Sequence, residues 1–171
     1  MKEINYQFLK NTIKPRPYNA HKGSMGSLLS ICGSYGMAGA EILSAKSALR
    51  TGVGLLRLLI LKSVYPIVAP VVPEAVFLPV DNGDKLSFSM KNVYTINENI
   101  GKSKALLIGC GLSHNEDTEN LVQYIVKNCK IPMVLDADGL NCISNHINLL
   151  KEKSCDIIIT PHPGEMSRLT G

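Results

Sequence analysis

The sequence has no long uninterrupted hydrophobic run. The most apolar stretch, 64–80, contains four prolines and Glu74, and prolines would leave backbone groups without hydrogen-bond partners in lipid. The residues that follow Met1 do not form the apolar segment of a signal peptide. These absences exclude a membrane span in that stretch, and we expect a soluble, cytoplasmic protein.

The sequence also has little excess charge and no paired cysteine spacing. Eighteen Lys and Arg stand against fourteen Asp and Glu, scattered along the chain, which does not favour a nucleic-acid or membrane partner. The cysteines are five in number and none form a C-x-x-C pair: Cys32, Cys110, Cys129, Cys142 and Cys155. A disulfide framework, a zinc site and a redox dithiol are therefore not expected, and a reducing compartment fits best.

What is present is the composition of one folded domain. The 171 residues are 45% hydrophobic and 19% charged, which excludes a disordered tail, a collagen-like repeat and a coiled coil. Apolar runs of strand length alternate with stretches of helical period. This alternation predicts an α/β domain built from parallel β-α-β units.

The elements can be placed from local patterns. Strands are expected at 27–32, 55–61, 105–108, 132–135 and 156–159. A helix is expected over 38–51, ending at Gly52. The proline-rich stretch 63–74 predicts short helical turns, followed by an extended piece at 75–78. A capping box at 113–116 predicts the start of another helix.

Polar and glycine-rich clusters follow three of these strands, at 109–111, 136–141 and 160–165. Because the carboxyl ends of parallel strands meet at one edge of a sheet, we expect these clusters to line one crevice. Two further segments, 21–26 and 33–40, offer glycines at which backbone N–H groups could approach an anion. Each of these segments could equally be a plain structural turn.

Individual side chains in the clusters leave alternatives open. Asp136 and Asp138 could hold Mg²⁺ through water or accept hydrogen bonds from ligand hydroxyls, or they could serve as a turn former and a helix N-cap. Two prolines hold His162 rigidly at a strand end, which is hard to explain by packing alone. Cys110 is not expected to be a catalytic thiol, and His146 is assigned no role.

Taken in order, five segments resemble motifs of the ADP/ATP-dependent NAD(P)H-hydrate dehydratases, members of the ribokinase-like superfamily. The segments are 21–26, 33–40, 109–112, 134–141 and 160–165. Three residues depart from the family pattern: Ala38 and Cys110 stand where Pro is usual, and Gly139 stands where Ala is common.

The resemblance implies a ribokinase-like three-layer α/β/α fold with a mostly parallel sheet, incomplete on its C-terminal side. Residues 1–171 would form a single α/β domain that corresponds to about the first three-fifths of a family member. The downstream part of the family holds the nucleotide phosphates and carries a catalytic Asp in a Gly-Thr-Gly-Asp type motif, which this sequence lacks. The family's lyase activity is therefore expected to be absent from the isolated chain.

The activity implied by the resemblance is repair of NADHX or NADPHX to NADH or NADPH, with ADP or ATP and Mg²⁺ as cofactors. Ala40, Gly111 and His162 would line the pocket for the damaged dinucleotide, with Asp136 and Asn141 as neighbours. Gly111 and Ala40 should face one another across adjacent strand ends, and a bulky residue at Gly111 should block the ligand while leaving the fold largely intact. A homo-oligomer is expected, without nucleic-acid or membrane partners.

Three alternatives to this function stay open. One is a small-molecule kinase of the same superfamily that acts on a vitamin-precursor alcohol, against which the long segment 160–165 argues. Another is a noncatalytic nucleotide-binding module that needs a second chain. The third is a fragment that binds no ligand well.

Overall fold

A computed structural model describes residues 3–171 and contains one six-stranded sheet of order β3-β2-β1-β4-β5-β6. The strands are β1 (Ser27–Ile31), β2 (Leu55–Leu61), β3 (Val76–Val80), β4 (Ala105–Ile108), β5 (Met133–Leu135) and β6 (Ile157–Ile159). All five strand pairings are parallel. The α/β fold with a mostly parallel sheet is confirmed.

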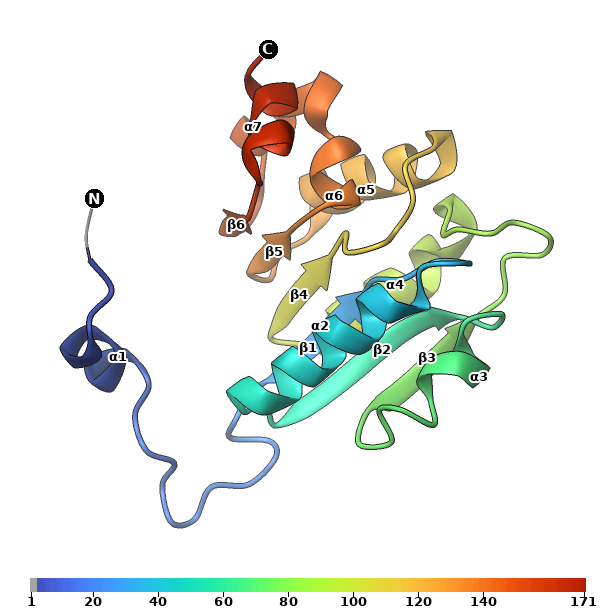
Figure 1. Cartoon of the computed structure of the whole chain (residues 1–171). Coiled ribbons are helices and arrows are strands. Elements are labelled where there is room, and N and C mark those ends of the chain that lie inside the picture. Colours follow the sequence, from blue (N-terminus) through green and yellow to red (C-terminus); the bar gives the residue numbers. More distant parts are fainter. Residues whose placement is uncertain (1–2) are drawn as a thin grey trace.

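Helices cover the sheet from two sides, which gives three layers (Figure 1). The α-helices are α1 (Tyr6–Thr12), α2 (Ala38–Thr51), α3 (Tyr65–Val68), α4 (Val93–Ile100), α5 (Glu116–Asn128), α6 (Asp138–Asn141) and α7 (Pro163–Thr170), and the 3-10 segments are η1 (Met90–Asn92) and η2 (Ser144–Lys151). In Figure 1, α2 and α3 lie in front of the sheet and α4 and α5 behind it. Helix α1 stands apart from this body and buries none of its residues.

Most expected elements match the structure closely. Helix α2 spans the predicted residues and ends at Gly52, whose φ of 98° is left-handed. Strands β2 and β4 have the predicted bounds. The extended piece expected at 75–78 is shifted, because β3 continues through Pro79. Since β3 is an edge strand, the missing N–H of Pro79 costs no hydrogen bond inside the sheet.

The capping box expected at 113–116 is wrong by two residues. Asn115 is the N-cap of α5: its side chain accepts from the Thr118 N–H, and Thr118 Oγ1 accepts from the Asn115 N–H. Ser113 has a left-handed φ of 72°, which differs from the extended backbone that an N-cap residue adopts. Spacing by itself did not distinguish the two positions.

One charged side chain belongs to the core. Glu41 lies on the buried face of α2 and is 0% exposed. Its carboxyl oxygens accept hydrogen bonds from Ser30 Oγ at 2.8 Å and from the Cys32 N–H at 3.1 Å. Burial raises the pKa of Glu41 to about 8, so this carboxyl group is mainly protonated at neutral pH. It ties α2 to the end of β1.

A second constraint is the contact between the turn after β4 and the start of α6. A Cβ atom on Gly109 would lie 2.0 Å from the Asp136 carbonyl oxygen and 2.7 Å from the Gly139 nitrogen. Gly109 also has a φ of 125°, where side chains are strained. The backbones can approach this closely only because position 109 has no side chain.

One face of the sheet is only partly covered. The face of the sheet that α2 covers carries a row of register partners from four neighbouring strands. These residues are Ser30, Leu107, Val134 and Ile158. Ser30 is fully buried beneath α2, Leu107 and Val134 are half-buried, and Ile158 is 64% exposed. Figure 1 shows α2 in front of β1 and β2, with the same face of β5 and β6 left open.

The Glu41 site predicts a pH dependence of stability. Because the folded state holds this proton up to a pKa of about 8 and the unfolded state releases it near 4.5, the free energy of unfolding falls as pH rises through that window. The slope is up to ~1.4 kcal/mol per pH unit. We expect Glu41→Gln to remove this component in urea denaturation, while Glu74→Gln on an exposed loop retains it. Equal pH dependence in both variants would contradict the assignment.

The Gly109 contact predicts a large difference between two glycine variants. Gly36 also has a positive φ, of 85°, but an added Cβ there meets nothing within 4 Å. Gly36→Ala should lower the free energy of unfolding only by the backbone strain, ~1–2 kcal/mol. Gly109→Ala adds a collision with backbone atoms and should cost roughly 3 kcal/mol or more. Thermal denaturation of the two variants measures the difference, and equal losses would show that the contact is unimportant.

Candidate functional site

The sheet order places a topological switch point between β1 and β4, and the turns that follow these two strands are joined there. The Gly33 N–H donates to the Cys110 carbonyl at 2.8 Å, and the Ser34 and Ser113 hydroxyls are hydrogen-bonded at 2.8 Å. The two loops therefore form one continuous floor at the carboxyl edge of the sheet.

Gly111 and Ala40 meet at this point, as expected. A Cβ atom on Gly111 would lie 2.6 Å from Ala40 Cβ, and Gly111 has a left-handed φ of 63°. The expectation that a bulky residue at Gly111 leaves the fold largely intact is wrong, because that side chain would press against the first turn of α2. The small size of both residues lets α2 start close to the turn after β4.

Asp136 connects three strand ends. Its Oδ1 accepts from the Thr160 hydroxyl at 2.6 Å, and its Oδ2 accepts from the Cys110 thiol at 3.3 Å. These partners follow β6 and β4, while Asp136 itself follows β5. The clusters predicted to line one crevice are thus brought together by one carboxylate.

Asp138 and Asn141 extend this network. Asp138 accepts from the Ser113 N–H at 2.9 Å and from Asn141 Nδ2 at 3.3 Å, and Asn141 Oδ1 accepts from Arg168 Nε at 2.9 Å. The N-cap alternative for Asp138 is wrong: the N-cap position of α6 is Ala137, which has a strained φ of 50°, and Asp138 is the first helical residue.

His162 begins α7 and is its N-cap. Its Nδ1 accepts from the N–H groups of Gly164 at 3.0 Å and Glu165 at 3.4 Å, and Glu165 Oε2 accepts from the His162 N–H at 2.9 Å. Most of the side chain, 62%, is nevertheless exposed. The ring thus stabilises the helix start through Nδ1, and its Nε2, which lies 3.2 Å from Glu165 Oε1, is the nitrogen left to reach a ligand. Contact of His162 with a ligand stays a prediction.

The carboxylates of Asp136 and Asp138 are hydrogen-bonded within the protein. Each oxygen of Asp136 and of Asp138 already accepts a hydrogen bond from the protein. Among residues 3–171, no group of three His, Cys, Asp or Glu side chains is placed to hold a metal ion. Of the alternatives for this pair, hydrogen bonding is the one that the geometry favours.

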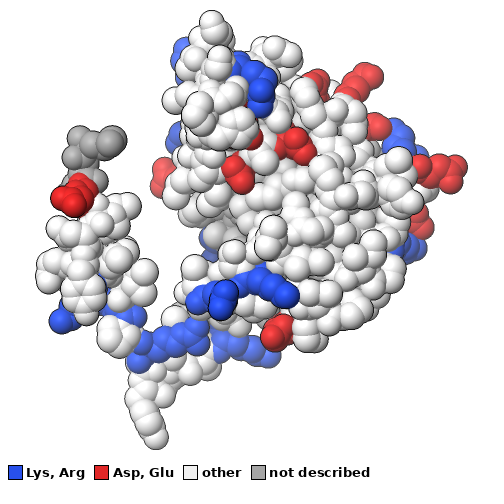
Figure 2. All heavy atoms as spheres, viewed as in Figure 1, with Lys and Arg blue, Asp and Glu red and all other residues white. Residues whose placement is uncertain are grey.

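The segment 21–26 lies at the other edge of the sheet. The Leu55 N–H donates to the Gly26 carbonyl, which places the segment beside the amino ends of β1 and β2. With Lys104 it lines a separate hollow of about 300 Å³. Figure 2 shows basic side chains near this lower edge and the N-terminal segment, while most visible acidic side chains lie in the upper half. This motif does not join the crevice.

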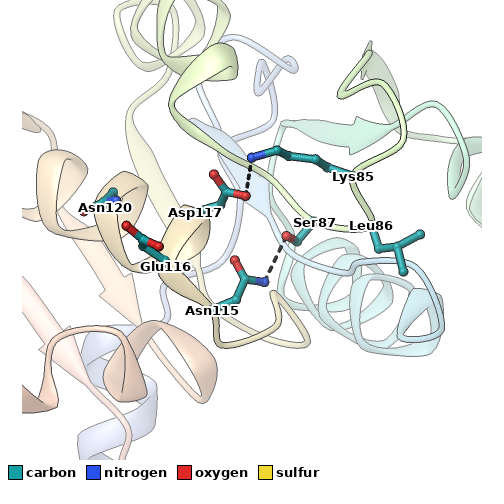
Figure 3. Close-up of a pocket in the computed structure, with 7 residues that line it drawn as sticks. All are labelled: Lys85, Leu86, Ser87, Asn115, Glu116, Asp117 and Asn120. Atoms are coloured by element: carbon teal, nitrogen blue, oxygen red, sulfur yellow. Dashed lines mark hydrogen bonds and ion pairs between the residues drawn. The ribbon is translucent and has the colours of Figure 1, made fainter.

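Another hollow, of about 480 Å³, adjoins the Gly33–Ala40 turn (Figure 3). Its lining residues come from two segments: Lys85, Leu86, Ser87, Asn115, Glu116, Asp117 and Asn120. Asp117 pairs with Lys85, and Asn115 donates to Ser87 Oγ at 3.1 Å. None of the five predicted site residues lines it. With Lys85 paired, Glu116 leaves the rim negatively charged, which disfavours a phosphate group.

The sequence patterns gave no role to three residues that lie around the site: Glu41, Ser34 and Ser113. Glu41 carried a usable signal, since it shares a helical face with Ala38 and Ala45. The pairing of Ser34 with Ser113 joins residues that are distant in sequence, and no local pattern indicates it.

The described helices include none long and apolar enough to cross a membrane.

Comparison with known proteins agrees with this geometry. The profile of the family described as NAD(P)H-hydrate dehydratase matches residues 28–171. The ADP-dependent (S)-NAD(P)H-hydrate dehydratase of Streptococcus pneumoniae is 30% identical over 171 residues, and the bifunctional NAD(P)H-hydrate repair enzyme of Thermofilum pendens is 33% identical over 159 residues, 93% of this chain. The chain covers 56% of the first relative and 30% of the second.

Solved structures show the same likeness. A hypothetical protein of Streptococcus mutans superposes with a TM-score of 0.82 at 27% identity, over 98% of this chain and 57% of that one. The ADP/ATP-dependent NAD(P)H-hydrate dehydratase of Bacillus subtilis, co-crystallised with ATP/Mg²⁺, gives 0.74 at 27% identity, over 96% and 54%. This chain thus spans about half the length of these dehydratases. With the family profile matched over most of its residues, the chain belongs to the NAD(P)H-hydrate dehydratase family.

Proposed function

We propose that residues 1–171 carry the damaged-nucleotide-binding half of an ADP- or ATP-dependent NAD(P)H-hydrate dehydratase. The observation that carries this proposal is the convergence of the strand ends at the switch point, the place called the crevice here. There the turns with Gly33, Gly111 and Asp136 meet through direct hydrogen bonds and backbone contacts, in a chain whose relatives are named for this activity.

The crevice offers groups suited to a dinucleotide. The turns after β1 and β4 can present backbone N–H groups to the phosphates, as glycine turns at strand ends do in other α/β proteins. Asn141 and the exposed ring of His162 can hydrogen-bond ribose or nicotinamide groups. Asp136 accepts from Thr160 and Cys110, so its role would be to hold the walls of the pocket together. Ala40 and Gly111 contact each other closely, and their small size lets the start of α2 lie directly against the turn after β4.

The chemistry of the reaction explains the need for a nucleotide. Hydroxide is a poor leaving group, and phosphorylation of the ring hydroxyl allows phosphate to leave and the double bond to form. The carboxylates of Asp136 and Asp138 accept hydrogen bonds from the protein, and no third His, Cys, Asp or Glu of residues 3–171 joins them in a metal-binding group. We therefore assign the binding of ADP or ATP and Mg²⁺ to the part of the relatives that this chain does not match.

The open sheet face supports that division. Leu107 and Val134, together with Leu43 of α2, line an apolar groove of about 420 Å³. The part of the relatives without a counterpart here is 46% of the Bacillus subtilis enzyme, enough polypeptide to supply covering helices and further strands. We propose that this part, in the same or another chain, covers the face. The exposed apolar residues Tyr6 of α1 and Ile13, which follows this helix, support a homo-oligomer.

The proposed site predicts binding without turnover. Titration calorimetry of the 171-residue chain should detect NADHX, and addition of ADP and Mg²⁺ should not restore NADH absorbance. A vitamin-precursor alcohol should not bind. Binding of that alcohol in place of NADHX would favour the kinase alternative and overturn the proposal.

His162→Asn tests the ligand role of the ring, because Asn retains a side-chain acceptor for the helix N-cap but removes the imidazole. Loss of one ligand hydrogen bond, ~0.5–1.5 kcal/mol, should weaken NADHX binding several-fold. The control is His146→Asn on an exposed part of η2, which should bind like the parent. Parental affinity in His162→Asn would limit His162 to capping α7.

The open sheet face at β5 and β6 predicts that Ile158→Lys acts differently in the isolated chain and in a longer chimera. Ile158→Lys should reduce self-association of the isolated chain with little change in stability, because Ile158 is 64% exposed. In a chimera that continues after Gly171 with the unmatched part of the Bacillus subtilis enzyme, the same variant should lower thermal stability. The control is Tyr94→Lys, since Tyr94 is 79% exposed. An unaffected chimera would show that the unmatched part does not cover this face.

A further inference from the structure

The structure brings together two thiols that sequence spacing gave no reason to pair. Cys32 directly follows β1 and Cys110 lies in the turn after β4, and these two strands are neighbours. The Gly109 N–H donates to the Ile31 carbonyl and the Gly33 N–H donates to the Cys110 carbonyl. Hydrogen bonds on both sides of Cys32 thus hold the two segments side by side.

The two thiols lie close enough that each shifts the pKa of the other. Ile31 and Ile108 are register partners in the sheet, and Cys32 and Cys110 follow them by one and two residues. Neighbouring strands lie ~4.8 Å apart, and a disulfide requires Cα atoms about 4.4–6.8 Å apart. Neighbouring positions of this kind are within the reach of a disulfide.

The two cysteines differ in access. Cys110 is half-buried, whereas Cys32 is 0% exposed. The hydrogen bond from Cys32 lowers the pKa of Cys110, and the same bond together with burial raises the pKa of Cys32. Cys110 is therefore the more accessible thiol and the one of the pair whose deprotonation is favoured, and Cys32 is placed to resolve the product.

We propose that Cys32 and Cys110 form a modification site, a dithiol that hydroperoxides convert to a reversible disulfide. The Cys110 thiolate attacks one peroxide oxygen, the O–O bond breaks, and Cys110 becomes a sulfenic acid while the other oxygen leaves and takes up a proton. The Cys32 sulfur then attacks the Cys110 sulfur. Its proton joins the departing hydroxide as water, and one S–S bond replaces two S–H bonds.

The site lies inside the crevice, so oxidation has a local consequence. Cys110 Sγ donates to Asp136 Oδ2 at 3.3 Å, and a disulfide sulfur has no proton to donate. Asp136 would then lose the link to the end of β4 and keep only the one to Thr160 on the side of β6. The change should weaken NADHX binding several-fold until the disulfide is reduced, a consequence that rests on the proposed function.

A second pair in the same chain provides an internal control. Cys129 and Cys155 also lie close enough to shift the pKa of one another, but burial raises the pKa of both, that of Cys155 to about 11. Contact between thiols is therefore shared by both pairs, while only Cys110 favours the thiolate. At limiting peroxide, Cys129 and Cys155 should stay reduced.

The test is peptide mapping by mass spectrometry after limiting hydrogen peroxide and alkylation of free thiols. We expect one cross-linked peptide pair that contains Cys32 and Cys110, with the loss of two hydrogen atoms of mass, reversed by dithiothreitol. Cys32→Ser should instead accumulate a sulfenic acid at Cys110 that dimedone traps. Cys142→Ser, at a buried position away from the pair, should form the cross-link like the parent.

Two results would overturn the proposal. One is a parent chain in which Cys110 stays alkylatable or is oxidised to the sulfinic acid without a cross-link. The other is a cross-link that forms equally between Cys129 and Cys155. Calorimetry with NADHX before and after oxidation then tests the consequence separately. Formation of the disulfide with unchanged affinity would overturn the effect on the ligand site and leave the modification site standing. A reduced chain that binds no NADHX would count against the proposed function alone.

Discussion

The site depends on one contact between backbones, in which the turn at Gly109 lies directly against the segment from Asp136 to Gly139. A side chain at position 109 would occupy the space of the Asp136 carbonyl oxygen. With the contact in place, the turn after β4 reaches both the Asp136 carboxylate and, through Ser113, the carboxylate of Asp138. The same turn contacts Ala40 of α2 through Gly111. Close packing of glycines thus fixes the relative positions of three strand ends.

The carboxylates in this arrangement act mainly within the protein. The carboxylate oxygens of Asp136 and Asp138 accept hydrogen bonds from Thr160, Cys110, Ser113 and Asn141. A carboxylate with a protein hydrogen bond on each oxygen holds neighbouring segments together and supports the wall of a site.

The two faces of the sheet differ in how far helices cover them. Behind the sheet, α4 and α5 supply a complete layer, and in front α2 covers β1 and protects the buried Glu41. The front of β5 and β6 is left with half-buried Val134 and exposed Ile158. Exposed apolar rows of this kind mark surfaces that another polypeptide segment covers. The crevice, the thiol pair and the open face all lie on the part of the sheet between β1 and β6.

Local sequence patterns predicted many of the strands and helices, though not α1, α4 and α7, and which elements meet is visible only in the folded chain. The bounds of α2 and its stop at Gly52, and the strands at 55–61 and 105–108, follow from periodicity and local backbone preference, which act over a few residues. The cap of α5 was misplaced because Ser113 is held in a left-handed conformation beside Asp138, a residue far away in the chain. The contact of Cys32 with Cys110, and the separation of segment 21–26 from the crevice, depend on strand order. Strand order is set by burial of whole elements against one another, and no local spacing in the sequence records it.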